Sequence, residues 1–462
     1  MPRPDRWILF FLVLLALVVR CSWLGLDELA HDEPFTVVMA HRSLPDLFSQ
    51  LATENNPPLH FLLMHAWVRM VPLDEAWLRL PSAVFGALAV WPLFLLGRAF
   101  RGTGVAIGTV LLFLLSNYHQ GFAHEVRSYS LFTLLTCLVM WWLWVAAQGR
   151  GRAWIGLLAL NTLLVHTHFL GWAVVGLQLV LVLLLPSFHA GRTPLAKALL
   201  GTAVLFVPYG STFVHRVSNT VAQGTWLTAP TPEELYNMIW RWSNAPVLAV
   251  LFLLVIAHGA YRDKVRCPGI QVGLIWSFLP LFTLFFASFL TPVFLDRYLA
   301  FAAPGFALLT AHSLVILLTG SRLANVPMAL ACLGMTATFT PWEGNGLHPS
   351  AVVARAEEWR GSDPVVIQPS WYRNTYAWHL DRQLVREPDL LDTRLRERGI
   401  FPTDQLKDLL PVPEQHTTMV RVDAWAALTD PQGTVSAALH RSYPHMEMEE
   451  ADRKVLVERY SR

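Results

Sequence analysis

The sequence contains few charged residues. Asp, Glu, Lys and Arg make up 15% of its 462 positions, whereas hydrophobic residues make up 54%. A soluble domain carries about 25% charged residues, so this composition excludes an ordinary soluble protein and indicates a membrane protein. Cysteine is also scarce, with four in all, each in or beside an apolar segment. Their spacing excludes a disulfide framework and a cysteine-based zinc site.

Two short signals are absent. The sequence has no Asn-x-Ser/Thr glycosylation site, which favours a bacterial protein. No Ala-x-Ala cleavage site follows the first apolar run, so we expect that run, preceded by Arg3 and Arg6, to remain as an uncleaved first helix. No feature points to nucleic acid as a partner.

What the sequence has instead is a series of long apolar segments. Eleven of them predict membrane crossings. They are Ile8–Gly25, Leu80–Leu96, Val105–Tyr118, Ser130–Ala147, Trp154–Val165, Leu170–Leu185, Leu195–Phe213, Val247–His258, Ile270–Leu290, Tyr298–Leu318 and Ala324–Phe339. Leu59–Val71 is shorter and carries His60, His65 and Arg69, so we expect a juxtamembrane or re-entrant helix in the first outer loop.

Basic residues fix the predicted orientation. With Leu59–Val71 left outside, clusters such as Arg98/Arg101, Arg150/Arg152 and Arg262–Arg266 all fall in inner loops, as the positive-inside rule requires. The N-terminus is then cytoplasmic. Eleven crossings place the segment after Pro341 outside the inner membrane.

The charges divide the chain into two predicted domains. Up to Pro341 there are 20 basic and 14 acidic residues, and from Trp342 onward there are 15 and 19. We therefore expect a transmembrane domain over 1–341 and a water-facing domain over 342–462. Within the second, Val365–Ile367, Met419–Val422 and Val455–Val457 predict strands, and Pro388–Arg398 predicts a polar helix. This pattern indicates a small α/β domain.

Acidic residues gather in the first outer loop. Asp27, Glu28, Asp32 and Glu33 follow the first predicted crossing. Charge runs usually face water, and this is the simpler interpretation for Asp27 and Glu28. For Asp32 and Glu33 we favour a functional role, because a pair of carboxylates at the mouth of a membrane helix is costly to maintain.

Three further outer turns place ionisable groups beside helix ends. They are His124–Tyr129 with Glu125 and Arg127, His166–His168, and Asp296–Tyr298 with Arg297. Glu125 and Arg127 could simply pair, as could Asp296 and Arg297, and the two histidines could be helix-end hydrogen-bonding groups. An arginine at the start of a helix also suits a bound phosphate. Together with Asp32, Asn56 and His60, these turns predict one outward-facing cavity.

These motifs, in this order and on this side of the membrane, resemble the GT-C-fold glycosyltransferases that use polyprenyl-phosphate sugars. That family includes the protein O-mannosyltransferases and the lipid A aminoarabinose transferases. The matching runs are Asp32-Glu33, Asn56-Pro57-Pro58-Leu59-His60, Arg127–Leu131, His168-Phe169 and Asp296–Leu299. Many relatives have histidine where this chain has Asn56.

The resemblance implies a fold and an activity. The fold would be a polytopic α-helical membrane protein with about eleven transmembrane helices, juxtamembrane helices in the first outer loop and a small C-terminal α/β extracytoplasmic domain. The activity would be transfer of a sugar from a polyprenyl phosphate to a lipid, glycan or protein acceptor. Asp32 would be the catalytic base, with Glu33 beside it. The donor would be bound by Asn56, His60, Glu125, Arg127, Tyr129, His168, Arg297 and Tyr298.

The chemistry suits these residue types. An acceptor hydroxyl needs a carboxylate to take its proton, and a phosphate leaving group needs cationic donors. Attack in a single step inverts the anomeric carbon. No cofactor is required, and a divalent cation stays open. The alternative is a transporter or flippase, although we find neither an inverted repeat nor a charged residue in the middle of a span.

Overall fold

The computed structural model describes residues 2–54, 56–150, 152–409 and 416–462. These residues form two compact units. The first contains Met1–Leu24, Gln50–His60 and Arg79–Pro341. The second contains Gly25–Ser49, Phe61–Leu78 and Trp342–Arg462, so the C-terminal segment is joined by two stretches of the loop predicted to be the first outer loop.

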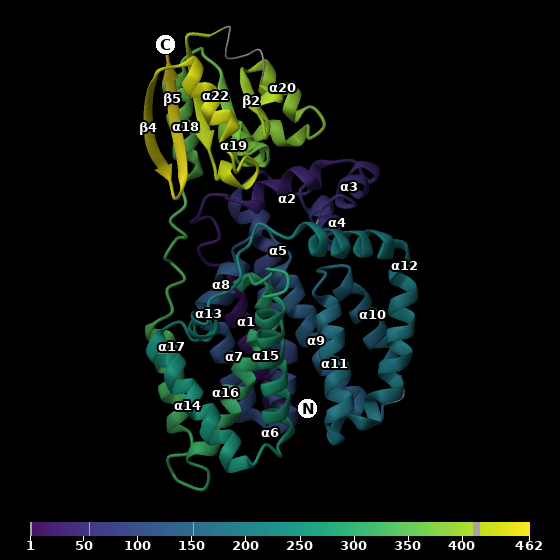
Figure 1. The fold of residues 1–462 in the computed structure, drawn as a ribbon. Helices are drawn as coiled ribbons and strands as arrows, with labels where there is room; N and C mark the ends of the chain where they lie inside the picture. Colours follow the sequence, from purple (N-terminus) through teal and green to yellow (C-terminus); the bar gives the residue numbers. More distant parts are fainter. Residues whose placement is uncertain (1, 55, 151, 410–415) are drawn as a thin grey trace. The chain divides into compact units, whose positions relative to one another are not determined.

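The first unit is a bundle of helices (Figure 1). Its longer helices are α1 (Arg3–Cys21), α6 (Val90–Arg101), α7 (Thr103–Leu114), α9 (Tyr129–Ala147), α10 (Ala153–Val165), α11 (Gly171–Leu184), α12 (Arg192–Gln223), α13 (Glu233–Ser243), α14 (Pro246–Asp263), α15 (Pro268–Ala287), α16 (Ala303–Leu317) and α17 (Val326–Ala337). Shorter elements are α8 (Asn117–Ala123) and the 3₁₀ turns η1 (Pro186–Gly191) and η2 (Asp296–Leu299). The helices α4 (Pro58–Trp67) and α5 (Glu75–Leu88) each have residues in both units.

Each of the eleven apolar segments falls on a helix. In the described part of the chain, five helical stretches are long and apolar enough to cross a membrane, namely Glu75–Arg101, Tyr129–Ala147, Pro186–Ala222, Pro246–Asp263 and Pro268–Ala287. A sixth is added if α7 and α8, which are bent by 64°, count as one span. Four further apolar helices have 10 to 17 residues. The chain is therefore a multi-pass membrane protein, and the count of eleven stays a prediction.

The short helix predicted at Leu59–Val71 is confirmed. It is α4, which begins at Pro58 and has ten residues, or about 15 Å at 1.5 Å per residue. That is roughly half the thickness of a bilayer's hydrocarbon core. The length supports the expectation that this segment does not cross.

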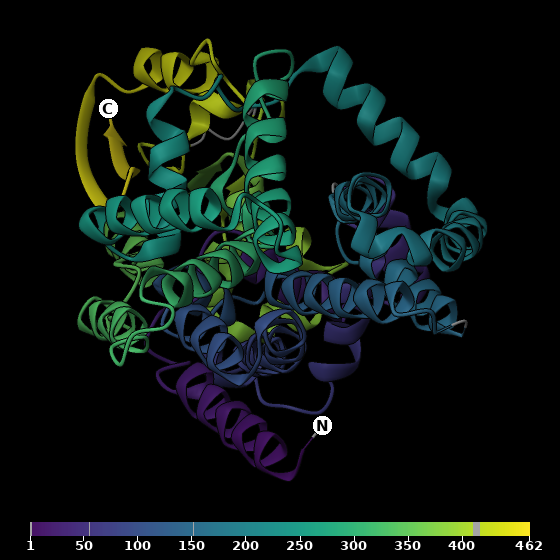
Figure 2. The same ribbon diagram turned by 90° about the horizontal axis from the view of Figure 1, so that it is seen from below.

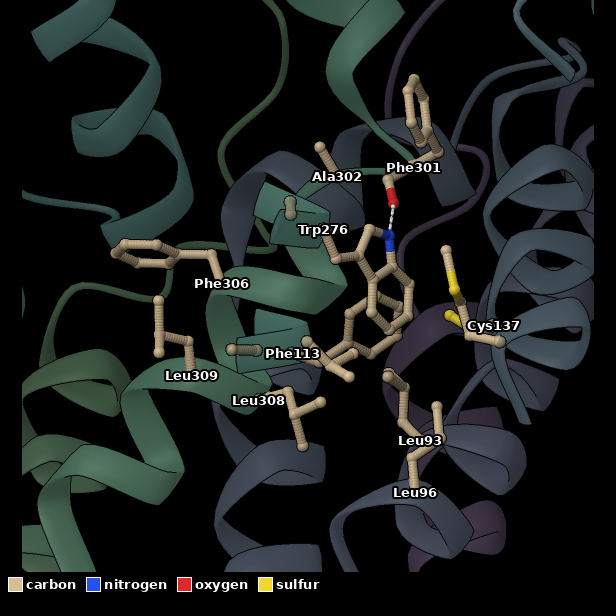
Figure 3. Close-up of a cluster of buried hydrophobic side chains, with 14 of the residues drawn as sticks. Leu93, Leu96, Phe113, Cys137, Trp276, Phe301, Ala302, Phe306, Leu308 and Leu309 are labelled. Carbon is tan, nitrogen blue, oxygen red and sulfur yellow. Dashed lines mark hydrogen bonds between the residues drawn. The ribbon is translucent and has the colours of Figure 1, made fainter. Parts of the chain in front are cut away.

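The core of the bundle is packed around α16. This helix lies against α7, α14 and α15, and thirteen of its fifteen residues are buried. Trp276 of α15 is fully buried and donates its indole N–H to the carbonyl of Phe301, 2.7 Å away (Figure 3). This hydrogen bond gives the buried indole N–H a partner, and it holds the backbone of the segment just before α16 in place.

The first helix lies at the edge of the bundle. Seen from below, α1 (purple) flanks the other helices, and it contacts α6 and α7 (Figure 2). Trp7, Phe10 and Phe11 are more than half exposed on its outer face, as expected of side chains that face lipid. On the inner face, buried Arg20 donates to Gln120 and to the carbonyl of Phe113, so its charge is held by polar groups.

The second unit contains an α/β domain. Its five-stranded sheet has the order β2-β1-β3-β5-β4, with β1 (Val365–Gln368) parallel to both β2 (Ile400–Pro402) and β3 (Thr418–Asp423). The strands β5 (Val455–Ser461) and β4 (His445–Asp452) continue it antiparallel. Its helices are α18 (Pro349–Arg360), α19 (Arg373–Leu380), α20 (Leu391–Glu397) and α22 (Thr434–Ser442), with 3₁₀ turns η3 (Ser370–Tyr372), η4 (Arg382–Arg386), η5 (Leu406–Asp408) and η6 (Ala426–Leu428). The three predicted strands and the predicted polar helix are confirmed, the helix beginning three residues later than expected.

The first outer loop adds two helices to this unit. They are α2 (Asp32–His41) and most of α3 (Leu44–Leu51). Arg42, just after α2, forms an ion pair with Asp389, and Arg382 pairs with Glu75. These ion pairs connect the loop between α1 and α5 to the C-terminal segment. The domain boundary between Pro341 and Trp342, which was predicted from charge alone, stays a prediction.

The membrane orientation can be tested with reporter fusions. A reporter at residue 265, in the Arg262–Arg266 loop, should be cytoplasmic, and one after Arg462 should be extracytoplasmic, because only this arrangement keeps the basic clusters inside. Alkaline phosphatase and green fluorescent protein fusions at both positions measure this. The prediction has an odd number of crossings between these two positions. If both reporters lie on the same side of the membrane, the predicted number of crossings and the predicted orientation are wrong.

Candidate functional site

Arg127 lies in the short turn between α8 and α9. It is 9% exposed, and its Nη2 atom is 3.5 Å from the side-chain oxygen of Asn56. The carbonyl of Arg127 accepts a hydrogen bond from Ser82 of α5 at 3.3 Å. The turn is therefore held from two sides. Glu125 lies in the same turn and is half-buried.

The segment from Asn56 to His60 is fixed by its backbone. The carbonyl of Asn56 accepts from the hydroxyl of Tyr209 at 3.2 Å, and the amide of Leu59 donates to the carbonyl of His166 at 2.9 Å. His60 is 2% exposed. Burial, and then the neighbouring guanidinium of Arg127, lower the pKa of His60 to about 3. This histidine is therefore neutral at physiological pH.

His168 lies among aromatic rings. Its ring is stacked on Phe132, with centroids 5.0 Å apart, and contacts Tyr298 edge-on at 5.6 Å. Tyr129 lies 6.0 Å away. The Nδ1 atom of His168 accepts from the amide of Leu170, so its tautomer is set by the backbone.

The charges near His168 show where the arginines gather. Burial, and then the guanidinium groups of Arg127 and Arg297, lower the pKa of His168 to about 3. Both arginines are thus close enough to one imidazole to affect its protonation. His60 and His168 add no positive charge, so the positive field here comes from arginine.

Arg297 is presented by the 3₁₀ turn η2. Its own amide donates to Asp296 Oδ1 at 2.7 Å, and Asp296 Oδ2 pairs with Arg241 of α13 at 2.5 Å. The carbonyl of Asp296 accepts from the hydroxyl of Tyr118. The Asp296 carboxylate therefore serves to anchor this turn. The sequence did not single out Arg241, because nothing in its own segment marks a distant ion pair.

The first unit thus brings most of the predicted donor-binding residues together. Asn56 contacts Arg127, His60 is affected by Arg127, and both arginines are near His168 with Tyr129 and Tyr298 around it. The elements that supply them are the turn before α4, the α8–α9 turn, the α10–α11 turn and η2. All four lie at helix ends, as the sequence predicted.

Asp32 and Glu33 belong to the second unit, at the start of α2. Glu33 is 5% exposed, and its carboxylate accepts from the amide of Ala30 at 3.3 Å. Asp32 is half-buried, and its carbonyl accepts from the hydroxyl of Thr36. The two side chains therefore have different surroundings. Glu33 stabilises the loop before the helix, while Asp32 is the first residue of α2, at the N-terminal end of the helix dipole.

Asp27 and Glu28 do more than face water. Asp27 accepts from the amide of Asn345 at 2.8 Å, and Glu28 accepts from both the amide and the hydroxyl of Ser350. The simpler interpretation drawn from the charge run was therefore wrong for both. These contacts could not be read from sequence, because the partners lie more than 300 residues away.

Metal-ligating side chains do not cluster in the described part of the chain. Over residues 2–54, 56–150, 152–409 and 416–462, no three His, Cys, Asp or Glu residues are grouped so that they could hold an ion. A divalent cation therefore stays an open question for the reaction.

Comparisons with known proteins give structural neighbours alone. No protein-family model and no curated protein matches the sequence. Among solved structures, ArnT from Cupriavidus metallidurans in the apo state superimposes with a TM-score of 0.64 at 14% identity, covering 99% of this chain and 98% of ArnT. The same enzyme bound to undecaprenyl phosphate gives 0.62, also at 14% identity, with 98% of both chains covered.

A second, archaeal neighbour has the same fold. The oligosaccharyltransferase AglB from Archaeoglobus fulgidus, in complex with an inhibitory peptide and a dolichol-phosphate, gives a TM-score of 0.56 at 11% identity. The match covers 95% of this chain and 72% of AglB. ArnT, a lipid A aminoarabinose transferase, and AglB are both members of the GT-C fold, so the fold implied by the sequence motifs is confirmed. The chain has the GT-C fold of these membrane-embedded transferases.

Proposed function

We propose that the protein is a glycosyltransferase of the bacterial inner membrane. It moves a sugar from a polyprenyl-phosphate donor to a lipid, glycan or protein acceptor on the outer face. The observation that carries this proposal is the pair Arg127 and Arg297 beside a neutral His168, on the fold of two transferases that were solved with polyprenyl phosphates.

The two arginines suit a phosphate leaving group. Guanidinium groups form charge-assisted, two-pronged hydrogen bonds with phosphate oxygens and stay protonated at any physiological pH. Because His60 and His168 are neutral, the phosphate would meet cationic donors and aromatic rings rather than a proton donor. The leaving group departs as a phosphate anion, so no acid is needed to protonate it.

Asp32 would act on the acceptor. Its carboxylate takes the proton of the attacking hydroxyl, the new glycosidic bond forms at the anomeric carbon, and the bond from that carbon to the phosphate oxygen breaks. One displacement of this kind inverts the configuration. Glu33 would hold the loop through Ala30, so that Asp32 is correctly placed.

A transfer assay with purified protein tests the proposal. Proteoliposomes containing the protein, a radiolabelled undecaprenyl-phosphate sugar and a bacterial envelope extract should yield label in the acceptor fraction and free undecaprenyl phosphate in equal amounts. Several labelled sugars are compared, since the identity of the sugar is open. Movement of the lipid-linked sugar between leaflets without cleavage would support the flippase alternative and overturn the transferase.

A further inference from the structure

We propose that Arg20 is a positioning residue for the donor site. It fixes the bend between α7 and α8, and thereby the turn that presents Arg127. This role rests on the proposed function, in which Arg127 binds the donor phosphate. Arg20 lies in the last turn of α1 and is 0% exposed. Like α7, α8 and Arg127, it belongs to the first unit.

A buried arginine inside an apolar bundle is costly. Removing a cation from water is unfavourable, so charged side chains inside membrane domains are rare and usually serve a function. In the part of the chain that the structure describes, Arg20 forms no ion pair with a carboxylate, and its partners are neutral. An apolar side chain would fill the same space without this cost. The guanidinium is therefore expected to do something that an apolar side chain cannot.

The Arg20 guanidinium spans the bend between two helices. Its Nη2 atom donates to the carbonyl of Phe113, in the last turn of α7, at 3.0 Å, and its Nη1 atom donates to Oε1 of Gln120, in α8, at 2.5 Å. The helices α7 and α8 are bent by 64° relative to each other. A guanidinium presents its N–H donors in one fixed plane, so a single side chain can bind both helices and hold this angle.

The helix α8 in turn caps the end of α1. The side-chain amide of Gln120 donates to the carbonyl of Val19 at 3.2 Å, and Nε2 of His124 lies 3.1 Å from the carbonyl of Arg20. Both carbonyls are in the last turn of α1, where helix carbonyls have no partner within the helix. Arg20, Gln120 and His124 together therefore join the end of α1 to α8, and we call these three residues the α1–α8 clamp.

The clamp lies directly before the turn that carries Arg127. His124 is the C-cap of α8, and Arg127 follows it by three residues. Because α8 has seven residues, or about 10 Å, a change of roughly 10° in the bend would move its end by about 2 Å. Misplacement of a functional group by about 1 Å can slow a reaction about 100-fold. Arg20 would thus act on the donor through Arg127, without touching the donor itself.

Equilibrium binding of labelled undecaprenyl phosphate to full-length variants in nanodiscs tests this role. Arg20→Met keeps an unbranched side chain but removes the charge and the donors, so binding should be about tenfold weaker than in wild type. In an Arg127→Ala background the same change should cost less than about twofold, because the residue that the clamp positions is gone, whereas in an Arg297→Ala background it should still cost about tenfold. A clamp that only stabilises the bundle would weaken binding equally in both backgrounds.

Arg98→Met is the matched control. Arg98 pairs with Asp5 at 2.5 Å and so joins the other end of α1 to α6. This variant loosens α1 without changing the clamp, and its lipid affinity should stay within about twofold of wild type. Arg20→Lys keeps the charge but not the planar set of donors, so its affinity should lie between those of wild type and Arg20→Met. If Arg20→Met fails to insert, Arg20→Lys is measured in the same two backgrounds.

Hydrogen exchange gives a second readout that needs no lipid. Amides of the α8–α9 turn, in peptides covering residues 117–131, should exchange faster in Arg20→Met than in wild type and at the wild-type rate in Arg98→Met. Unchanged exchange in this turn, or equal loss of binding in both backgrounds, would overturn the positioning role and leave the transferase. If wild type binds no undecaprenyl phosphate, the proposed function and the donor role of Arg20 both fail, whereas faster exchange confined to this turn would still show the clamp.

Discussion

Sugar transfer by the Asp32→Asn variant should be about two to four orders of magnitude slower than by wild type, the usual contribution of a positioned base. Asparagine has almost the same shape as aspartate but cannot take a proton. The folded structure should persist, because the change keeps the shape of the side chain and leaves in place the backbone carbonyl of Asp32, which accepts from the hydroxyl of Thr36. Undecaprenyl phosphate should bind as well as before or more tightly, because one negative charge is removed. Initial rates with labelled donor, together with lipid binding, measure both effects.

Glu33→Gln is the matched control for Asp32→Asn. The carboxylate of Glu33 accepts from the amide of Ala30, and the side-chain oxygen of glutamine can accept the same bond. We therefore expect a smaller loss of transfer than in Asp32→Asn. Near-normal transfer by Asp32→Asn would remove the proposed base and revive the flippase alternative. A larger loss in Glu33→Gln would exchange the roles of the two residues.

The helices of the bundle could be predicted because apolar length is a local property. Each apolar segment coincides with a helix, although α1 ends at Cys21 rather than continuing to Gly25, and α16 begins at Ala303 after the turn η2. Helix ends depend on turns and caps, which sequence marks less clearly than apolar length. The number of crossings is harder to predict, since several of these helices are shorter than a full span.

The C-terminal domain was predicted only in part. The buried strands β1, β3 and β5 have apolar residues and could be found. In contrast, β4 (His445–Asp452) is an edge strand in which five of eight residues are exposed and four are acidic, and β2 has three residues. Edge strands are often protected by charge, so their sequence looks like a loop. Their place in the sheet follows from pairing with distant strands.

The residues of the candidate site could also be predicted only where their own segment marks them. Arg127, His168 and Arg297 could be singled out because each lies in a polar turn between apolar helices. Ser82, which donates to the carbonyl of Arg127, and Tyr209, which donates to the carbonyl of Asn56, could not be singled out, since each lies inside an apolar helix. The contact between Trp371 and Trp425 likewise depends on two strands paired in register across more than 50 residues.

Replacing Arg127 or Arg297 with alanine should weaken binding of undecaprenyl phosphate by about 10- to 150-fold. Each change removes charge-assisted hydrogen bonds to phosphate, worth about 1.5–3 kcal/mol. Lysine at either position should restore part of the affinity, because it keeps the charge but cannot make the planar two-pronged contact. Equilibrium binding of labelled undecaprenyl phosphate to the purified variants, with their melting temperatures, measures the effect and its independence from folding.

Arg241→Ala is the matched control for these two arginines. It removes a guanidinium whose side chain is 49% exposed and which pairs with Asp296, next to Arg297. A partly exposed ion pair contributes about 0–1 kcal/mol, so lipid affinity should change by less than roughly fivefold. If Arg127 and Arg297 bind one phosphate, the loss in the double alanine variant should differ from the sum of the two single losses, since residues with a shared partner are coupled. Wild-type lipid affinity in both single variants would instead assign the arginines to structural ion pairs.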